Sequence, residues 1–275
     1  MSKQLSSART DQWATAITSV KQDKILIRGY AIDELMGRHS FGDAVYLLLT
    51  GELPSPAVSR VMEALLVSSL DHGALPPSTI SARTVSGTGA PLRAAAAAGV
   101  LALGSPLGGG GSIEACMRFL DEGLALTGDW VSYDDAARRL LDQHHSAGQL
   151  PPGYGHRLHK RDPRAARLMQ LAFELELEGG HTQFARAVEQ ELDTRQTTLG
   201  LTRTSLNSDG AIAAVAGDLG LDAETATLLF TISRVPGLVA HALEEQRRQP
   251  AMRQIDPSKH YYDGPSQRRL PQSPL

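Results

Sequence analysis

The chain has 275 residues, of which 41% are hydrophobic and 21% are charged, and its formal net charge is −3. This length is ample for a buried core in one large domain or two modest ones. The near-neutral charge gives no global field directed at nucleic acid or a membrane surface. Because Cys116 is the only cysteine, an intrachain disulfide is excluded and a reducing compartment is expected, with Cys116 a small buried hydrophobe.

Targeting signals do not stand out in the sequence. The N-terminal residues lack the apolar core of a signal peptide, and the small-residue run Ala94–Leu103 is too short to span a bilayer. We therefore expect a cytoplasmic protein that binds neither nucleic acid nor a membrane.

Helical patterns dominate the chain. Apolar periodicity predicts helices over Phe41–Leu49, Pro56–Ser69, Leu92–Leu103, Ser112–Leu126, Tyr133–Gln143, Pro163–Leu177, Gln183–Glu191 and Ala223–Ile232. Ser40 can cap the first of these helices, and Lys24–Arg28 is the best candidate for a short strand. The tail Gln249–Leu275 is expected to be irregular. The sequence therefore predicts a mainly α protein with about a dozen helices.

The run Leu150–Arg164, LPPGYGHRLHKRDPR, places a glycine-rich loop, a histidine and several cations between two predicted helices. Glycines let backbone N–H groups approach a ligand closely. Lys160 and Arg164 suit phosphate or carboxylate, and His156 can exchange a proton near neutral pH. The run predicts a site for a small anionic substrate with a phosphate-bearing carrier. The structural alternative is a loop followed by a solvated basic helix start.

Three further segments carry polar residues beside helices. In Asp71–Gly73, Asp71 could fix the tautomer of His72, or the segment could simply be a helix C-cap. In Asn207–Gly210, Asp209 could act as a general base, although helix capping is the better reading of this segment alone. Arg234 interrupts an apolar helix and needs a partner, which is either structural or a ligand.

Two tempting motifs are discounted. His144 and His145 are adjacent, so on a helix they do not face one site, and no third ligand lies at a suitable spacing. Gly108–Gly111 lacks the Gly-Lys-Ser/Thr of a phosphate-binding P-loop. No metal is therefore predicted.

Taken in order, these segments resemble the citrate synthase superfamily over nearly the whole chain. The residues that carry the resemblance are Arg28–Leu35 with Ser40–Phe41 and Tyr46–Pro54, Leu103–Gly110, Pro152–His156 with Asp162–Arg164, Asn207–Asp209, and Ile232–Arg234.

The resemblance implies a two-domain helical fold. The large domain would comprise residues 1–111 and 231–275, and the smaller domain, residues 112–230, would close over the substrate. Gly108–Gly111 would supply the hinge. Family members are homodimers or higher homo-oligomers, and the apolar helices Phe41–Leu49 and Leu92–Leu103 could provide the interface.

Two departures point to one branch of the family. Gly108 replaces the histidine that polarises the acetyl-CoA thioester in synthases, and such a lost donor is typically worth about 10²–10³ in rate. The stretch between Leu53–Pro54 and Asp71–His72 is also shorter than in typical synthases. With Asn207–Gly210, these features resemble the citryl-CoA lyase branch, which includes the C-terminal module of ATP-citrate lyase.

The resemblance implies cleavage, or reversible formation, of the C–C bond between an acetyl-CoA unit and oxaloacetate. The implied catalytic residues are His72 and His156, on the hydroxyl or carbonyl oxygen, and Asp209, which exchanges a proton with the acetyl methyl carbon. The residues implied to pair with substrate carboxylates are Arg164, Arg253 and, from a partner subunit, Arg269. The residues implied to receive coenzyme A, which enters as a thioester substrate, are Pro152, Gly153, Gly155 and Lys160.

Two alternatives stay open at this point. A citrate or 2-methylcitrate synthase-like acyltransferase would condense an acyl-CoA with a 2-oxo acid on the same fold. A non-catalytic CoA-binding homologue is favoured by Gly108 and opposed by the presence of His72, His156 and Asp209.

Overall fold

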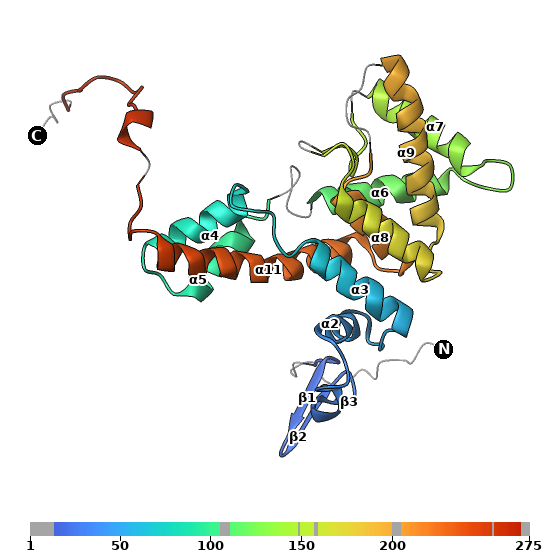
Figure 1. Ribbon diagram of the computed structural model, residues 1–275, viewed down its shortest axis with the longest axis horizontal. Coiled ribbons are helices and arrows are strands. Elements are labelled where there is room, and N and C mark those ends of the chain that lie inside the picture. Colours follow the sequence, from blue (N-terminus) through green and yellow to red (C-terminus); the bar gives the residue numbers. More distant parts are fainter. Residues whose placement is uncertain are drawn as a thin grey trace, which may run out of the picture. The chain divides into compact units, whose positions relative to one another are not determined.

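A computed structural model describes residues 14–104, 111–147, 149–156, 159–199, 205–254 and 256–270. Over these residues the protein has eleven α-helices and one three-stranded sheet (Figure 1). The predicted mainly α fold class is therefore confirmed.

The chain forms two compact units. Unit 1 comprises residues 1–71 and 103–236, and unit 2 comprises residues 72–102 and 237–275. These compact units have other boundaries than the predicted domains. The predicted domains are defined by movement over a substrate, which compactness does not test, so the boundaries near residues 111 and 230 stay a prediction. Of the predicted hinge, Gly108–Gly110 lies outside the described residues.

The N-terminal part of unit 1 is a small antiparallel sheet. Its strands are β1 (Thr18–Lys21), β2 (Lys24–Ile27) and β3 (Tyr30–Ala31), in the order β1-β2-β3, followed by α1 (Ile32–Leu35). Thr18 pairs with Ile27 and Leu26 pairs with Ala31. The strand predicted at Lys24–Arg28 is confirmed as β2, whereas β1 and β3 were not predicted.

Helix α2 (Phe41–Thr50) begins at a capping box. Ser40 Oγ accepts from Asp43 N at 3.1 Å, and Asp43 Oδ2 accepts from Ser40 N at 3.0 Å. The next helix, α3 (Pro56–Ser68), has a proline at its first position, where no intrahelical N–H bond is lost. Both helices match their predictions.

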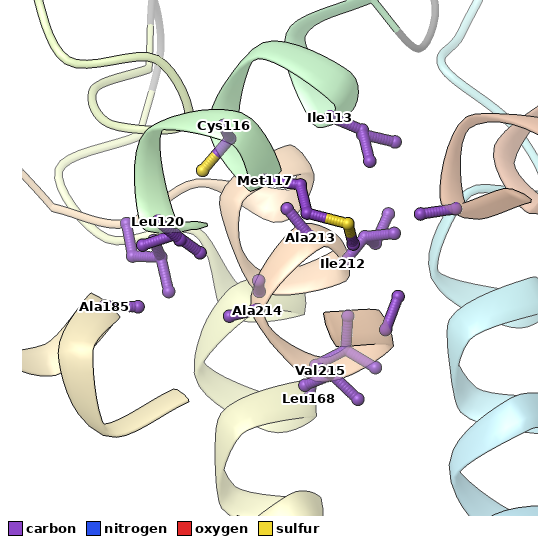
Figure 2. Packing of buried hydrophobic residues seen from close by; sticks show 14 of the residues in the cluster. Ile113, Cys116, Met117, Leu120, Leu168, Ala185, Ile212, Ala213, Ala214 and Val215 are labelled. Carbon is purple, nitrogen blue, oxygen red and sulfur yellow. The ribbon is translucent and has the colours of Figure 1, made fainter. Parts of the chain in front are cut away.

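The remainder of unit 1 surrounds one helix. Helices α6 (Gly111–Ala125), α8 (Pro163–Glu174) and α9 (Gly180–Leu199) pack against α10 (Ser208–Asp218), and α7 (Tyr133–Ser146) packs on α6 and α9. Figure 2 shows Met117 of α6 beside Ala213 and Ile212 of the alanine-rich α10, in the same buried cluster as Cys116 and Leu120. Cys116 is fully buried, as predicted, and burial raises the pKa of its thiol. The small side chains of α10 permit this close packing.

Unit 2 is built from α4 (Pro77–Gly87), α5 (Leu92–Leu101) and the C-terminal half of α11 (Ala223–Arg248) (Figure 1). The alanine-rich α5 packs closely at Gly99, where a Cβ atom would lie 2.9 Å from Leu238 Cδ2. Helix α4 was not predicted.

Helix α11 joins the predicted helix Ala223–Ile232 to the predicted apolar helix that carries Arg234, and it continues through Pro236 to Arg248. A proline inside a helix removes one backbone hydrogen bond, but buried residues on both sides of it, Phe230 and Leu238, hold the helix together. By length and composition alone α11 could cross a membrane, and 44% of its apolar window is buried inside the fold. The described tail beyond α11 is irregular apart from the 3₁₀ turn Pro257–Lys259, as predicted.

Candidate functional site

The predicted CoA loop lies against the segment that leads into α10. Gly155 N donates to Ser205 O at 2.8 Å, and Asn207 N donates to Gly153 O at 2.9 Å. Gly153 has a φ of 83°, and a Cβ atom there would lie 2.8 Å from Gly210 Cα. Only glycine fits both this backbone conformation and this close approach. The glycines therefore seat the loop on α10, as a scaffold for a ligand-binding backbone would require.

The start of α10 carries the predicted proton-transfer residue. Asn207 caps the helix, because its Oδ1 accepts from Asp209 N at 3.0 Å and from Gly210 N at 3.1 Å. The capping interpretation is thus confirmed for Asn207, and Asp209 lies in the first turn, where the helix dipole favours a negative charge. The half-buried Asp209 carboxylate accepts a hydrogen bond from the hydroxyl of Ser112 on α6.

A buried carboxylate, Asp162, joins the start of α8 to the start of α10. Its Oδ1 accepts from Arg164 Nε at 3.0 Å, and its Oδ2 accepts from Arg164 Nη2 at 2.7 Å and from Ser208 N at 3.2 Å. Burial alone would raise the pKa of Asp162, but the hydrogen bonds from Arg164 and Ser208 lower it to about 2. Asp162 therefore orients Arg164, a predicted carboxylate-binding residue, and also bonds the backbone of Ser208, the residue before Asp209.

The guanidinium of Arg164 keeps one edge for a ligand. Its Nε and Nη2 bond Asp162, whereas no side chain among the described residues bonds its Nη1. The side chain is partly exposed. A second carboxylate could bind this outer edge with two parallel hydrogen bonds, so Arg164 fits its predicted role.

His156 and Lys160 continue the same loop. His156 Nδ1 accepts from His159 N at 3.1 Å, and the two imidazole rings lie 4.5 Å apart. A neutral His156 that accepts at Nδ1 carries its proton on Nε2, which can then face a substrate oxygen. Lys160 is exposed. Unit 1 thus brings Gly153, Gly155, Arg164 and Asp209 onto hydrogen-bonded segments, with Pro152, His156 and Lys160 on the same loop.

Three predicted site residues, His72, Arg253 and Arg269, belong to unit 2. Arg253 Nε lies 3.0 Å from Oε1 of the buried Glu245, which also binds Arg83 at 2.7 Å. Arg269 is exposed in the tail. The roles of these three residues stay predictions.

The C-cap interpretation of Asp71–Gly73 is wrong. Helix α3 ends at Ser68, with Ser69 as its cap. Asp71 instead pairs with Arg234, whose Nη1 lies 3.3 Å from Asp71 Oδ1. Arg234 is only 1% exposed, so its partner within unit 1 is structural, as a buried cation requires.

A groove of about 610 Å³ adjoins the loop between α8, α9 and the segment before α10, and Arg161, Asp162, Phe173, Arg186 and Leu206 are among its lining residues. None of the predicted catalytic residues lines it. Among the residues that the structure describes, no group of three His, Cys, Asp or Glu side chains could hold a metal ion. Gly108, which stands where the family has a histidine, lies outside the described residues.

Comparison with known proteins gives one family. The model of the citrate synthase C-terminal domain matches residues 8–59 and 54–255. Citrate synthase 2 of Bacillus subtilis is 29% identical over 211 residues, 76% of this chain and 53% of the relative. A putative citrate synthase 2 of Mycobacterium tuberculosis is 31% identical over 198 residues, 70% of this chain and 49% of the relative. The chain spans about half the length of these curated relatives.

Solved structures of similar fold include two lyases. The citryl-CoA lyase from Hydrogenobacter thermophilus is 42% identical with a TM-score of 0.82, and the match covers 94% of this chain and 98% of that chain. ATP citrate lyase from Methanosaeta concilii, solved with (3S)-citryl-CoA, is 20% identical with a TM-score of 0.75, covering 94% of this chain and 42% of that chain. The second likeness concerns the fold alone.

Proposed function

The chain belongs to the citrate synthase family, and from this premise we propose that it is a citryl-CoA lyase. The observation that carries the proposal is the likeness to the Hydrogenobacter thermophilus citryl-CoA lyase, which extends over nearly the full length of both chains. The citrate synthases, in contrast, are about twice as long as the matched region.

The proposed reaction converts citryl-CoA into oxaloacetate and acetyl-CoA. A base removes the proton of the tertiary hydroxyl, and the oxygen electrons form the ketone of oxaloacetate. The C–C bond breaks, and its electron pair leaves as the enolate of acetyl-CoA. An acid then protonates the enolate carbon to give the methyl group. Donors that hold the forming oxyanions lower the barrier further.

Unit 1 offers groups for these steps. Asp209 would transfer the proton to the enolate carbon from the first turn of α10. The outer edge of Arg164 would bind a substrate carboxylate, while Asp162 holds its other edge. His156 would contact the hydroxyl or ketone oxygen. The Pro152–Gly155 backbone would receive the CoA moiety, and Lys160 would contact a phosphate.

The proposal also gives roles to the predicted residues outside unit 1, in a homodimer or higher homo-oligomer. His72 would act on the same oxygen as His156, Arg253 would bind a substrate carboxylate, and Arg269 would reach the site of a partner subunit. An apolar groove of about 500 Å³ between α4 and α5, with Ile80 and Leu101 exposed, supports an interface on this face. The same proposal places the protein in the cytoplasm, with neither nucleic acid nor a membrane as a partner.

A second candidate function is synthesis rather than cleavage. The curated relatives at about 30% identity are citrate synthases, so the same site could condense acetyl-CoA, or another acyl-CoA, with oxaloacetate or another 2-oxo acid. The condensation step is the reverse of the lyase reaction, and hydrolysis of the resulting thioester by water then releases free CoA. The two functions differ in which reactants the purified protein turns over.

The test is an assay of the purified full chain with synthetic citryl-CoA. Oxaloacetate release is followed through NADH oxidation by malate dehydrogenase. We expect steady release with one CoA thioester remaining for each citryl-CoA consumed. Release of free CoA and citrate without oxaloacetate would mean thioester hydrolysis and would overturn the proposal. CoA binding by calorimetry without any turnover would favour the non-catalytic homologue.

A further inference from the structure

One face of α6 contacts both parts of the candidate site. Ser112 and Cys116 are four residues apart, so their side chains lie on the same side of the helix. The Ser112 hydroxyl donates to Asp209 Oδ2 on α10. Cys116 lies under the CoA loop, since a Cβ atom at Gly153 would overlap its sulfur. This face therefore sets the carboxylate and the loop from one rigid element.

The backbone that carries Ser112 is firmly held. Its neighbour Ile113 and the next-turn residue Met117 are buried in the core, where they face Ile212 of α10 (Figure 2). Close packing of this kind leaves little freedom for α6 to slide along α10. The position of the Ser112 hydroxyl is thus fixed relative to the turn that carries Asp209.

The Asp209 carboxylate has few other restraints. Besides Ser112, its one other side-chain hydrogen bond among the described residues comes from Ser208 Oγ, 3.4 Å from Oδ1. That bond is long and weak. Rotation about the last torsion of an aspartate is only loosely restricted by its own rotamer. The hydrogen bond from Ser112 is therefore the main restraint on the carboxylate plane.

A hydroxyl suits a residue that changes its protonation state. Lysine, arginine and backbone N–H groups only donate, so they hold a carboxylate best when it is ionised. A serine hydroxyl both donates and accepts. Ser112 can therefore keep its hydrogen bond to Asp209 while the carboxyl gains and loses a proton.

We propose that Ser112 is a positioning residue for Asp209: it holds Oδ2 and leaves Oδ1 to exchange the proton with the acetyl carbon. This inference rests on the proposed lyase function. Ser112 itself touches neither substrate nor CoA in this assignment, so its effect reaches the reaction through Asp209 alone.

The test is a double-mutant cycle on the full chain with citryl-CoA as substrate. Ser112→Ala should lower kcat about tenfold while KM stays within about twofold, because one oriented hydrogen bond is lost after binding. Ser112→Thr, which keeps the hydroxyl, should recover kcat to within about threefold. In an Asp209→Asn background, Ser112→Ala should change kcat by less than about twofold, because coupled residues are not additive.

Ser132→Ala is the matched control. Ser132 caps α7, and its hydroxyl contacts Asp135 with the same chemistry, so this variant should leave kcat unchanged. The proposal is overturned if Ser112→Ala has wild-type kcat, if threonine does not rescue it, or if the tenfold loss persists in the Asp209→Asn background.

Crystal structures separate this inference from the function on which it rests. In Ser112→Ala the Asp209 carboxylate should rotate away from its wild-type plane or become disordered, while Asn207 and Gly153 stay in place. If wild-type protein does not cleave citryl-CoA, the lyase proposal fails, and the positioning role of Ser112 is then tested by the crystal structures alone. An unmoved, well-ordered Asp209 carboxylate in the variant would overturn the positioning role in either case.

Discussion

The two ends of α10 carry the same residue type in opposite settings. At the C-terminal end, the buried Asp218 accepts backbone bonds from Gly179 at 2.7 Å, His181 at 2.8 Å and Thr182 at 3.0 Å, and the Thr182 hydroxyl bonds it at 2.6 Å. At the N-terminal end, the half-buried Asp209 receives bonds from serine hydroxyls.

The difference in hydrogen bonding distinguishes a structural role for Asp218 from the proposed chemical role of Asp209. Burial alone would raise the pKa of Asp218, but hydrogen bonds from His181, Thr182 and Gly179 lower it. A carboxylate so fully bonded is locked in its charged form and serves the fold. Asp209 is half-buried and, within the described part of the chain, accepts hydrogen bonds from only two side chains, the hydroxyls of Ser112 and Ser208. Within one helix, the number and kind of donors thus separate an aspartate held by the fold from the aspartate of the proposed proton transfer.

The largest expected effect follows from Asp209→Asn, which removes the proposed proton-transfer group at the N-terminal end of α10. An amide cannot transfer the proton, so kcat for citryl-CoA cleavage should fall by roughly 10²–10⁴. The free energy of unfolding should change by less than about 1 kcal/mol, since few bonds depend on the charge. Coupled oxaloacetate assays and urea unfolding measure both. Turnover within tenfold of wild type would remove Asp209 from the mechanism.

Asp218→Asn should do the opposite at the C-terminal end. The amide cannot satisfy all the donors that converge on the carboxylate, so we expect unfolding to become easier by about 3 kcal/mol, with kcat per folded molecule unchanged. Asp121→Asn is the matched control, because Asp121 binds the same His181 at 2.9 Å from an exposed position. Its cost should stay below about 1 kcal/mol. Equal costs for the two variants would contradict the comparison.

Asp162→Asn tests the carboxylate that holds Arg164 beside the N-terminal end of α10. Arg164 would lose its orienting partner, and KM for citryl-CoA should rise about tenfold with a loss of about 2 kcal/mol in stability. The pKa of Asp162 is about 2 in the folded protein. Its contribution to stability is therefore present above its unfolded pKa and disappears as the pH falls toward 2. Acid titration of unfolding in both proteins measures this, and identical acid profiles would contradict it.

The smallest expected effect is a pH dependence at the structural end of α10. Hydrogen bonding to Asp218 raises the pKa of His181 against the opposing effect of burial, and Asp121 raises it further. A raised folded pKa stabilises the protein fully below the unfolded pKa of about 6.5, and this stabilisation is lost as pH rises through the folded value.

His181→Gln should remove this pH-dependent stabilisation, which we expect to amount to less than about 1 kcal/mol. Unfolding free energies of wild type and variant, measured from about pH 6 upward, should converge as the pH rises. Parallel curves over this range would show that His181 does not titrate with folding.

Helices with local start signals could be predicted from the sequence. Ser40 and Asn207 predict the starts of α2 and α10, because helix capping depends only on residues that are close in the sequence. Helix α4 has a serine- and threonine-rich sequence with a weak apolar face, so it left no periodic signal. The sequence predicts two separate helices before and after Ile232, and their union into one helix through Pro236 depends on tertiary packing, which a local pattern does not contain.

The candidate site divides in the same way. Its glycines, Arg164 and Asp209 lie in recognisable motifs, and their assignment came from a family resemblance. Ser112 and Asp162 were missed as functional residues. The Ser112–Asp209 pair joins residues 97 positions apart, and which hydroxyl faces which carboxylate is decided by helix packing. An aspartate before Pro163 signals a helix cap, which hides the second role of Asp162 as the partner of Arg164.

The central claim is that this site cleaves citryl-CoA, and the most direct test is a ratio of two initial rates at one enzyme concentration. The first is oxaloacetate release from citryl-CoA, and the second is free CoA release from acetyl-CoA with oxaloacetate. We expect rapid oxaloacetate release and little free CoA. Rapid release of free CoA from acetyl-CoA and oxaloacetate, without cleavage of citryl-CoA, would contradict it and identify a synthase.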